Sequence, residues 1–288
     1  MRFAIIGAKG QVGQEFAKHL ARDEFIGLDV EELDVCDRES VRACLGPLSF
    51  DAVINLAAFH NVNGCEDDPE KAFAVNATGA FNVASVAAEM GKKVAFFSSD
   101  YVFGGEPARS TPYVEPDMAA PLNIYGASKV AGEHLVRAAR PDGHLVIRSS
   151  SLYGCVTSAK GWTFPELMLK KARDGDDLKV VNDQFMAPTY TYDLARRVLE
   201  LFERGAVGTF HVVNSGSCSW HELACATLEL AGLGADVRPV SADEFPAKAR
   251  RPGYSVLSSD RLQEFGMAPL RGWRDALKAY LIEKGEIR

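Results

Sequence analysis

The stretch that decides the fold is Phe3-Ala4-Ile5-Ile6-Gly7-Ala8-Lys9-Gly10-Gln11-Val12-Gly13, close to the start of the chain. Its four apolar residues predict a short buried strand, and Glu15 to Leu20 continue with helical spacing. The glycines at 7, 10 and 13 lie between strand and helix. Glycine there allows a tight turn, close approach of the backbone to a pyrophosphate, and close packing of the helix. The stretch therefore predicts the first unit of a dinucleotide-binding fold, with Gly7, Gly10 and Gly13 at the cofactor.

Further apolar runs repeat this pattern along the chain. Strands are expected at Phe25–Leu28, Ala52–Ala58, Lys93–Phe97, His144–Arg148 and Phe210–Val213, and long helices at 69–90 and 191–202. Continuous apolar strands that alternate with helices are typical of a parallel sheet covered on both faces. The fold class is therefore α/β, with a doubly wound parallel Rossmann sheet.

The chain length adds a second, smaller unit. At roughly 150 residues per domain, 288 residues correspond to about two units. We assign residues 1–150 and 189–214 to an NAD(P)-binding Rossmann domain. Residues 151–188 and 215–288 are assigned to a C-terminal substrate-binding lobe. This lobe should lie over the carboxyl ends of the strands, where open α/β sheets bind ligands.

Composition excludes several partners. The 32 basic and 39 acidic residues give a net charge of −7, and no basic run indicates nucleic-acid binding. No apolar stretch approaches the roughly 18 residues of a membrane span. The six cysteines contain no C-x-x-C pair, which suits reduced thiols in a cytoplasmic protein. Cys218, His221 and Cys225 only weakly suggest a metal site, because Cys225 should lie on the apolar face of a helix that Ser219 caps.

The end of the second strand bears on cofactor choice. Asp29 lies 16 residues beyond Gly13, where a carboxylate usually holds the adenosine ribose hydroxyls and repels a 2′-phosphate. This favours NAD(H), although Lys9 and Arg22 leave NADP(H) open. Asp34 could hold the adenine edge or could equally be a solvated turn residue.

A chemical site is expected where Tyr125 and Lys129 share one face of a helix, one turn apart. An ammonium near a phenol favours phenolate, so Lys129 should move the pKa of Tyr125 toward neutrality and allow general acid or base chemistry. Ser99 follows the strand at Lys93–Phe97, which places a hydroxyl at the carboxyl end of the sheet. There it can hydrogen-bond a substrate carbonyl.

The joint order of these motifs resembles the extended short-chain dehydrogenases/reductases, and specifically the dTDP-4-dehydrorhamnose reductase family. The resemblance runs from residue 1 to about residue 275. It rests on Gly10-Gln11-Val12-Gly13, Val53-Ile54-Asn55-Leu56-Ala57-Ala58, Asp100-Tyr101-Val102-Phe103, Pro121-Leu122-Asn123-Ile124-Tyr125-Gly126 through Glu133, Asn182-Asp183-Gln184-Phe185 with Ala187-Pro188-Thr189, and Arg251-Pro252-Gly253.

The resemblance implies a nucleotide-sugar 4-ketoreductase that uses NADH or NADPH, and it allows a homodimer. Tyr125 would be the proton donor, Lys129 its partner and ribose clamp, and Ser99 the group that polarises the carbonyl. The cofactor would also contact Gln11, Val12, Asp29, Asp34, Val35, Ala57, Ala58 and Phe59. The sugar nucleotide would contact Ser99, Asp100, Tyr125, Ser151 and Arg251.

The chain departs from the family pattern around the sugar. Ser151 stands where the family usually has Trp, and His60, Asn61 and Asn63 stand where it has Thr, Ala and Asp. These changes should reshape the sugar pocket. Of the family's Mg²⁺ site, Glu15 is kept but Tyr192 occupies the second acidic position, so we expect no metal.

Three alternative functions are weighed. A dehydratase would need a second acid after Asp100, where Tyr101 stands. A nucleotide-sugar 4-epimerase, in which the sugar turns over a retained cofactor, is not excluded by residues. A catalytically silent NAD(P)-binding subunit, resembling the regulatory subunit of methionine adenosyltransferase, is disfavoured because Ser99, Tyr125, Lys129 and the glycine loop are all present.

Overall fold

A parallel sheet of six strands forms the centre of this computed structural model, which describes residues 1–156 and 161–288. Residues 157–160 belong to the predicted substrate lobe and lie outside the described part. The strand order is β10-β5-β4-β3-β1-β2. The strands are β1 (Phe3–Ile6), β2 (Phe25–Leu28), β3 (Ala52–Asn55), β4 (Lys93–Ser99), β5 (His144–Ser149) and β10 (Gly208–His211). The order changes direction beside β1, so the doubly wound Rossmann sheet is confirmed.

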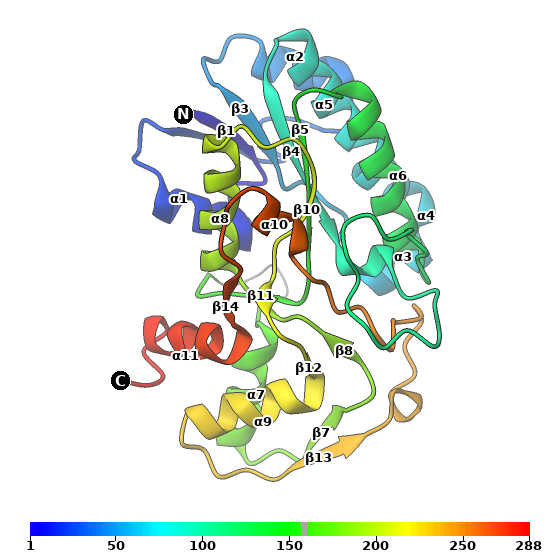
Figure 1. Ribbon diagram of the computed structural model, residues 1–288, viewed down its shortest axis with the longest axis vertical. Coiled ribbons are helices and arrows are strands. Elements are labelled where there is room, and N and C mark those ends of the chain that lie inside the picture. The colour runs from blue at the N-terminus through cyan, green and yellow to red at the C-terminus, as the bar shows by residue number, and fades with distance from the viewer. Residues whose placement is uncertain (157–160) are drawn as a thin grey trace.

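Helices cover both faces of this sheet (Figure 1). The helices α1 (Gln11–His19) and α8 (Thr191–Glu203) lie on one face, where Phe16 and Leu194 join a buried apolar cluster. On the other face lie α2 (Arg38–Leu45), α5 (Ala80–Glu89) and α6 (Ile124–Ala139), with a second cluster. The central strands β1 and β3 are buried along their whole length, which is why their sequences are almost continuously apolar, whereas the edge strand β2 is only partly buried.

The long helix expected at 69–90 is helical without a break from Pro69 to Glu89, but it is not α-helical throughout. It consists of α4 (Pro69–Phe73), a π-helix (Ala74–Gly79) and α5. Within the π-helix, the buried side chain of Asn76 accepts a hydrogen bond from Phe59 N at 2.9 Å and donates one to Phe59 O at 3.1 Å. The wider turn thus supports the loop after β3, consistent with the frequent use of π-turns near functional sites.

A smaller unit lies beside the carboxyl ends of the strands (Figure 1). It contains α7 (Phe164–Asp174), β7 (Leu178–Val181), α9 (Trp220–Leu230), β13 (Val237–Val240) and α11 (Trp273–Glu283), packed around their own apolar cluster. The remaining short elements of the whole chain are β6 (Leu152–Tyr153), β8 (Phe185–Met186), β9 (Thr189–Tyr190), β11 (Asn214–Ser215), β12 (Cys218–Ser219), β14 (Leu270–Gly272), α3 (Val62–Asp67) and α10 (Asp260–Glu264). Leu262, Met267 and Leu270 come from the part of the chain assigned to the substrate-binding lobe, yet they belong to the apolar cluster on the α1–α8 face of the sheet. The predicted domain boundaries stay a prediction. No helix in the described ranges is long and apolar enough to cross a membrane.

Candidate active site

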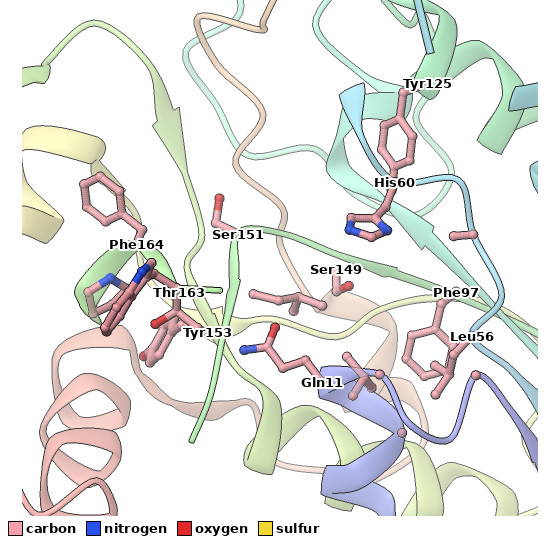
Figure 2. Close-up of a pocket in the computed structure, with 18 of the residues that line it drawn as sticks. Gln11, Leu56, His60, Phe97, Tyr125, Ser149, Ser151, Tyr153, Thr163 and Phe164 are labelled. Atoms are coloured by element: carbon pink, nitrogen blue, oxygen red, sulfur yellow. The ribbon is translucent and has the colours of Figure 1, made fainter. Parts of the chain in front are cut away.

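A cavity of about 580 Å³ opens at the carboxyl ends of the strands, between the glycine loop and the smaller unit. Figure 2 shows Gln11 and Tyr125 on opposite sides of it, Ser149 between them, and Thr163 and Phe164 at the far end. The predicted site residues that line this cavity are Gly7, Gly10, Gln11, Val12, Gly13, Ala58, Tyr125, Lys129 and Ser151. The structure therefore brings the predicted cofactor loop and the predicted chemical groups to one space.

The glycine loop fits a dinucleotide. A Cβ atom on Gly13 would lie 2.4 Å from Gly7 O, so α1 can approach β1 this closely only through glycine. No side chain caps the start of α1, which leaves backbone N–H groups for an anion. The Nε2 atom of Gln11 is buried and has no hydrogen-bond partner. An uncapped helix start and an unpaired donor in the same cavity suit a pyrophosphate.

Asp29 holds the same loop in place. Its carboxylate accepts hydrogen bonds from Lys9 N and Val30 N, each at 2.9 Å. The Lys9 side chain is exposed and pairs with Glu31 at 2.9 Å. Asp29 thus ties the end of β2 to the glycine loop, and the Lys9 ammonium lies nearby on its long side chain.

Tyr125, Lys129 and Ser99 meet where α6 begins beside the end of β4. Asn123 caps α6 by accepting a hydrogen bond from Gly126 N at 2.8 Å, which sets the first turn that carries Tyr125. The Ser99 side chain lies close enough to the Tyr125 hydroxyl to lower the pKa of that hydroxyl. Lys129 is buried, with its Nζ atom 4.3 Å from the centre of the Phe96 ring.

The expected effect of Lys129 on Tyr125 is corrected by this geometry. Burial raises the pKa of Tyr125 well above its usual value, and the nearby Ser99 side chain lowers it only in part. Burial also lowers the pKa of Lys129 to about 7. Because both groups lose their water, desolvation outweighs the attraction between ammonium and phenolate. Tyr125 is therefore a protonated acid at neutral pH, and Lys129 titrates near neutrality.

Asp100 lies beneath these residues rather than on the cavity wall. Its buried carboxylate accepts hydrogen bonds from Ser99 at 3.0 Å, Ser150 at 2.8 Å and Ser255 at 2.6 Å. Burial raises its pKa in spite of these three donors. The adjoining Ser151 has a φ of 46° and is the one non-glycine residue with positive φ in the described ranges. Asp100 thus joins the ends of β4 and β5 to the segment that carries Arg251.

Two aromatic residues that sequence reasoning missed form the far wall of the cavity. Phe164 and Trp220 are the first residues of α7 and α9, and their ring centres lie 4.8 Å apart. Each helix begins with a capping box, Thr163 to Glu166 in α7 and Ser219 to Glu222 in α9. The pattern Ser/Thr-aromatic-x-Glu, present twice in the sequence, was the signal that could have found this pair.

A second cavity of about 680 Å³ lies behind that aromatic wall and shares Phe164, Leu167 and Trp220 with the first. Its cationic lining residues are Lys171, Lys179, Arg250 and Arg251, against a single carboxylate, Asp243. Of these, sequence reasoning had singled out only Arg251, whose guanidinium donates to the Tyr101 hydroxyl at 3.2 Å. The balance of charge suits an anionic ligand.

The other predicted cofactor contacts lie at the edges of the site. Asp34 accepts a hydrogen bond from Cys36 N at 2.9 Å, and Val35 is buried in the core beside Gly79. Ala57 N donates to Asn55, and the backbone of Phe59 is held by Asn76. None of these four residues lines the main cavity, so their contact with a cofactor stays a prediction.

The residues of the suggested metal sites do not fit a metal ion. Glu15 is buried and pairs with Lys18 at 2.7 Å, and the same ammonium lies 2.8 Å from Glu283. The Lys18 ammonium thus occupies the position beside Glu15 that a metal ion would need. His221 contacts the carbonyl of Val237 at 2.9 Å and lies 3.6 Å from the Cys225 sulfur. Within the described ranges, no three His, Cys, Asp or Glu side chains gather as metal ligands.

Fold and cavity together define a Rossmann-type protein whose glycine loop suits a dinucleotide, with an adjoining cavity lined mainly by cationic side chains. The chain belongs to the family whose model is described as the RmlD substrate binding domain, which matches residues 1–285. It is 41% identical to the spore coat polysaccharide biosynthesis protein SpsK of Bacillus subtilis (strain 168), over 97% of this chain and 96% of that protein.

Two further relatives carry more specific descriptions. The dTDP-4-dehydrorhamnose reductase of Mycolicibacterium smegmatis is 39% identical, over 96% of this chain and 84% of its own. The crystal structure of the dTDP-4-dehydrorhamnose reductase of Bacillus anthracis, solved in complex with NADP, is 35% identical and superposes with a TM-score of 0.92. That alignment covers 98% of this chain and 99% of the relative.

Proposed function

We propose that the protein is a nucleotide-sugar 4-ketoreductase that reduces the 4-keto group of a dTDP-4-dehydro-6-deoxyhexose, such as dTDP-4-dehydrorhamnose or a close relative. The observation that carries this is the shared cavity, in which the glycine loop faces Tyr125 and Lys129. Membership of the family and the activity named for the M. smegmatis relative support the same reaction. The Bacillus anthracis relative was solved with NADP, which supports a nicotinamide cofactor here.

The cofactor would be held by the uncapped start of α1 and by the unpaired Gln11 amide. When bound, NADH or NADPH supplies the hydride for the 4-keto carbon. Tyr125 donates the proton to the developing alkoxide, since its raised pKa keeps the hydroxyl protonated at neutral pH. For Ser99 to donate a hydrogen bond to the same oxygen, its hydroxyl would turn away from Asp100, to which it donates in this structure. The Lys129 ammonium would stabilise the charge of that oxygen.

The nucleoside diphosphate would occupy the second cavity, where four cations can bind its phosphates. The sugar would then pass the Phe164–Trp220 wall and reach Tyr125 in the first cavity. Ser151 and Arg251 would contact the substrate from these two cavities, and Asp100 would act from below through Ser99. We place the enzyme in the cytoplasm, with a homodimer as its assembly.

The test is a panel of nucleotide-linked 4-keto sugars incubated with NADH and with NADPH, with the C4 configuration of each product read by NMR. We expect one equivalent of cofactor to be oxidised for each sugar reduced. In Tyr125→Phe, turnover should fall at least about 10²-fold, the usual scale for losing a general acid, while cofactor binding stays unchanged. Retention of most activity by that variant, or sugar inversion without cofactor consumption, would exclude the proposed reaction.

A further inference from the structure

A buried ion pair that the proposed reaction does not use lies one helical turn behind Lys129. Glu133 on α6 and Arg148 on β5 have side chains only 3% and 5% exposed. Arg148 donates from Nε to Glu133 Oε1 at 2.8 Å and from Nη2 to Oε2 at 2.7 Å. The two parallel bonds fix the carboxylate in one orientation. The cost of removing two charges from water can offset their attraction, so this ion pair need not stabilise the fold and can serve another role.

The same carboxylate joins α6 to the ends of two strands. Ser98 on β4 donates its hydroxyl to Glu133 Oε1 at 2.5 Å. Ser98 and Arg148 are partners in the β4–β5 register. Tyr125, Lys129 and Glu133 are spaced by four residues and therefore share one face of α6. Glu133 thus anchors the helix face that carries the two chemical groups.

Arg148 has no second carboxylate partner among the described residues. Its Nη1 atom lies 3.3 Å from His211 Nε2 and 3.3 Å from the carbonyl of Glu115. His211 contacts the carbonyl of Ser258 through Nδ1, so Nε2 is the acceptor. Burial and Arg148 lower the pKa of His211 to about 3, which keeps the ring neutral. The Arg148 charge is therefore compensated by Glu133.

Around Lys129, Glu133 is the anion that favours a charged amine. Burial lowers the pKa of Lys129, and the charge of Glu133 is the largest effect that raises it, followed by Cys65 on α3. Burial raises the pKa of Cys65 to about 11, so that thiol is neutral near pH 7. The other close neighbours are the Tyr125 hydroxyl, which is neutral as well, and the Phe96 ring on β4.

We propose that Glu133 is a positioning residue that acts on Lys129: Arg148 and Ser98 hold its carboxylate on the same buried face of α6, one turn beyond the lysine, where its negative charge favours the ammonium form. This inference rests on the proposed function, because Glu133 matters for catalysis only if the Lys129 ammonium takes part in the proposed reaction. The contacts that carry it are independent of which sugar is reduced.

The direct test is NMR titration of the Lys129 side chain in full-length protein labelled with ¹³C at lysine Cε. Lys129→Arg identifies the resonance by its loss. In Glu133→Gln the titration midpoint should fall by at least about half a pH unit, since an opposite charge nearby stabilises the ammonium. Glu133→Asp should recover part of the shift. Asp193→Asn is the matched control, because it breaks the bidentate Asp193–Arg271 pair on α8 and should leave the midpoint unchanged.

A double variant separates the effect of losing the Glu133 charge from the effect of leaving the Arg148 guanidinium without its carboxylate partner. Glu133→Gln with Arg148→Gln removes both charges and should still titrate below wild type. A return of the double variant to the wild-type midpoint would overturn the proposal, as would an unchanged midpoint in Glu133→Gln. The alkaline limb of the turnover profile should move down with the NMR midpoint. If wild type shows no ketoreductase turnover, the proposed function fails, and the NMR comparison still decides the electrostatic effect of Glu133.

Discussion

Ser151 is the residue whose backbone departs most from its sequence preference. A left-handed conformation costs a non-glycine residue about 1–2 kcal/mol, and such strain is concentrated at functional sites. Ser151 has this conformation, lines the main cavity and follows Ser150, which binds Asp100. The sequence predicts only that the side chain is small. The strain depends on how β5 leads into the loop, which no local pattern specifies.

The small side chain of Ser151 should widen acceptance of sugars. Ser151→Trp would place a ring opposite Phe164 and Trp220 in the same cavity. We expect the variant to favour smaller deoxysugars and to reject larger 4-keto sugars, with stacking worth roughly 0.5–1.5 kcal/mol for sugars that still fit. The measurement is kcat/KM across a series of sugar sizes. Tight, selective binding of dTDP-4-dehydrorhamnose by wild type and by Ser151→Trp alike would show that another ring, such as Trp162, already fills this role.

Asp29 should set the preference between the two cofactors. Its carboxylate beside a 2′-phosphate would cost about 1–3 kcal/mol after screening, so we expect a lower KM for NADH than for NADPH. Asp29→Asn removes the charge and keeps an acceptor oxygen for one of the two backbone amides, Lys9 N or Val30 N, which bond different oxygens of Asp29. The KM for NADPH should then fall relative to that for NADH. A wild-type preference for NADPH that Asp29→Asn leaves unaltered would show that Lys9, released from Glu31, decides the choice.

At the scale of elements, apolar periodicity located the strands and long helices well. The strand expected at Phe25–Leu28 has those bounds, and the helix expected at 191–202 ends one residue later. The strand expected at Ala52–Ala58 ends at Asn55, and the one expected at Phe210–Val213 lies two residues earlier, at Gly208–His211. The π-helix at Ala74–Gly79 was missed because its wider turn depends on Asn76 binding the Phe59 loop. Side-chain contacts between elements, such as the Glu133–Arg148 ion pair between α6 and β5, cannot be predicted from local sequence patterns.

Gly132 lets α6 pack directly on the π-helix and on β4. A Cβ atom there would lie 2.3 Å from Asn76 O and 2.7 Å from the Phe96 ring. Gly132→Ala should therefore lower the free energy of unfolding by about 1–3 kcal/mol, the range for an overpacked core. Urea denaturation measures the loss. Gly234→Ala, where nothing lies within 4 Å, is the matched control. Equal stability of both variants would mean that α6 can shift without cost.

At the scale of the whole molecule, the sequence predicts which residues line the cavity better than it predicts their pKa values. Tyr125, Lys129 and the glycine loop line one cavity, since strand ends and helix starts meet at one edge of a parallel sheet. Their roles stay a prediction. The pKa values of Tyr125 and Lys129 depend on burial by several elements at once. The cations of the second cavity come from α7, β7 and a loop, and their approach follows from tertiary structure alone.

The buried Lys129 should make stability depend on pH. The pKa is about 7 in the folded protein, against a usual value of about 10.4 in an unfolded chain. Between these values the unfolded chain binds more protons, so stability from this site rises with pH. Lys129→Met should therefore raise Tm most near pH 6–7, with a gain that shrinks toward pH 10. The exposed Lys278→Met serves as control. A gain that does not vary with pH would contradict the lowered pKa.

The central claim, hydride transfer to a 4-keto sugar, is tested most directly with NADH and, in parallel, NADPH, each carrying deuterium at both C4 positions of the nicotinamide. After incubation with dTDP-4-dehydrorhamnose and the cofactor that the enzyme uses, the account predicts one deuterium at C4 of the product sugar and one equivalent of oxidised cofactor formed. An epimerised or unchanged sugar without deuterium, and with no net oxidation of the cofactor, would contradict it.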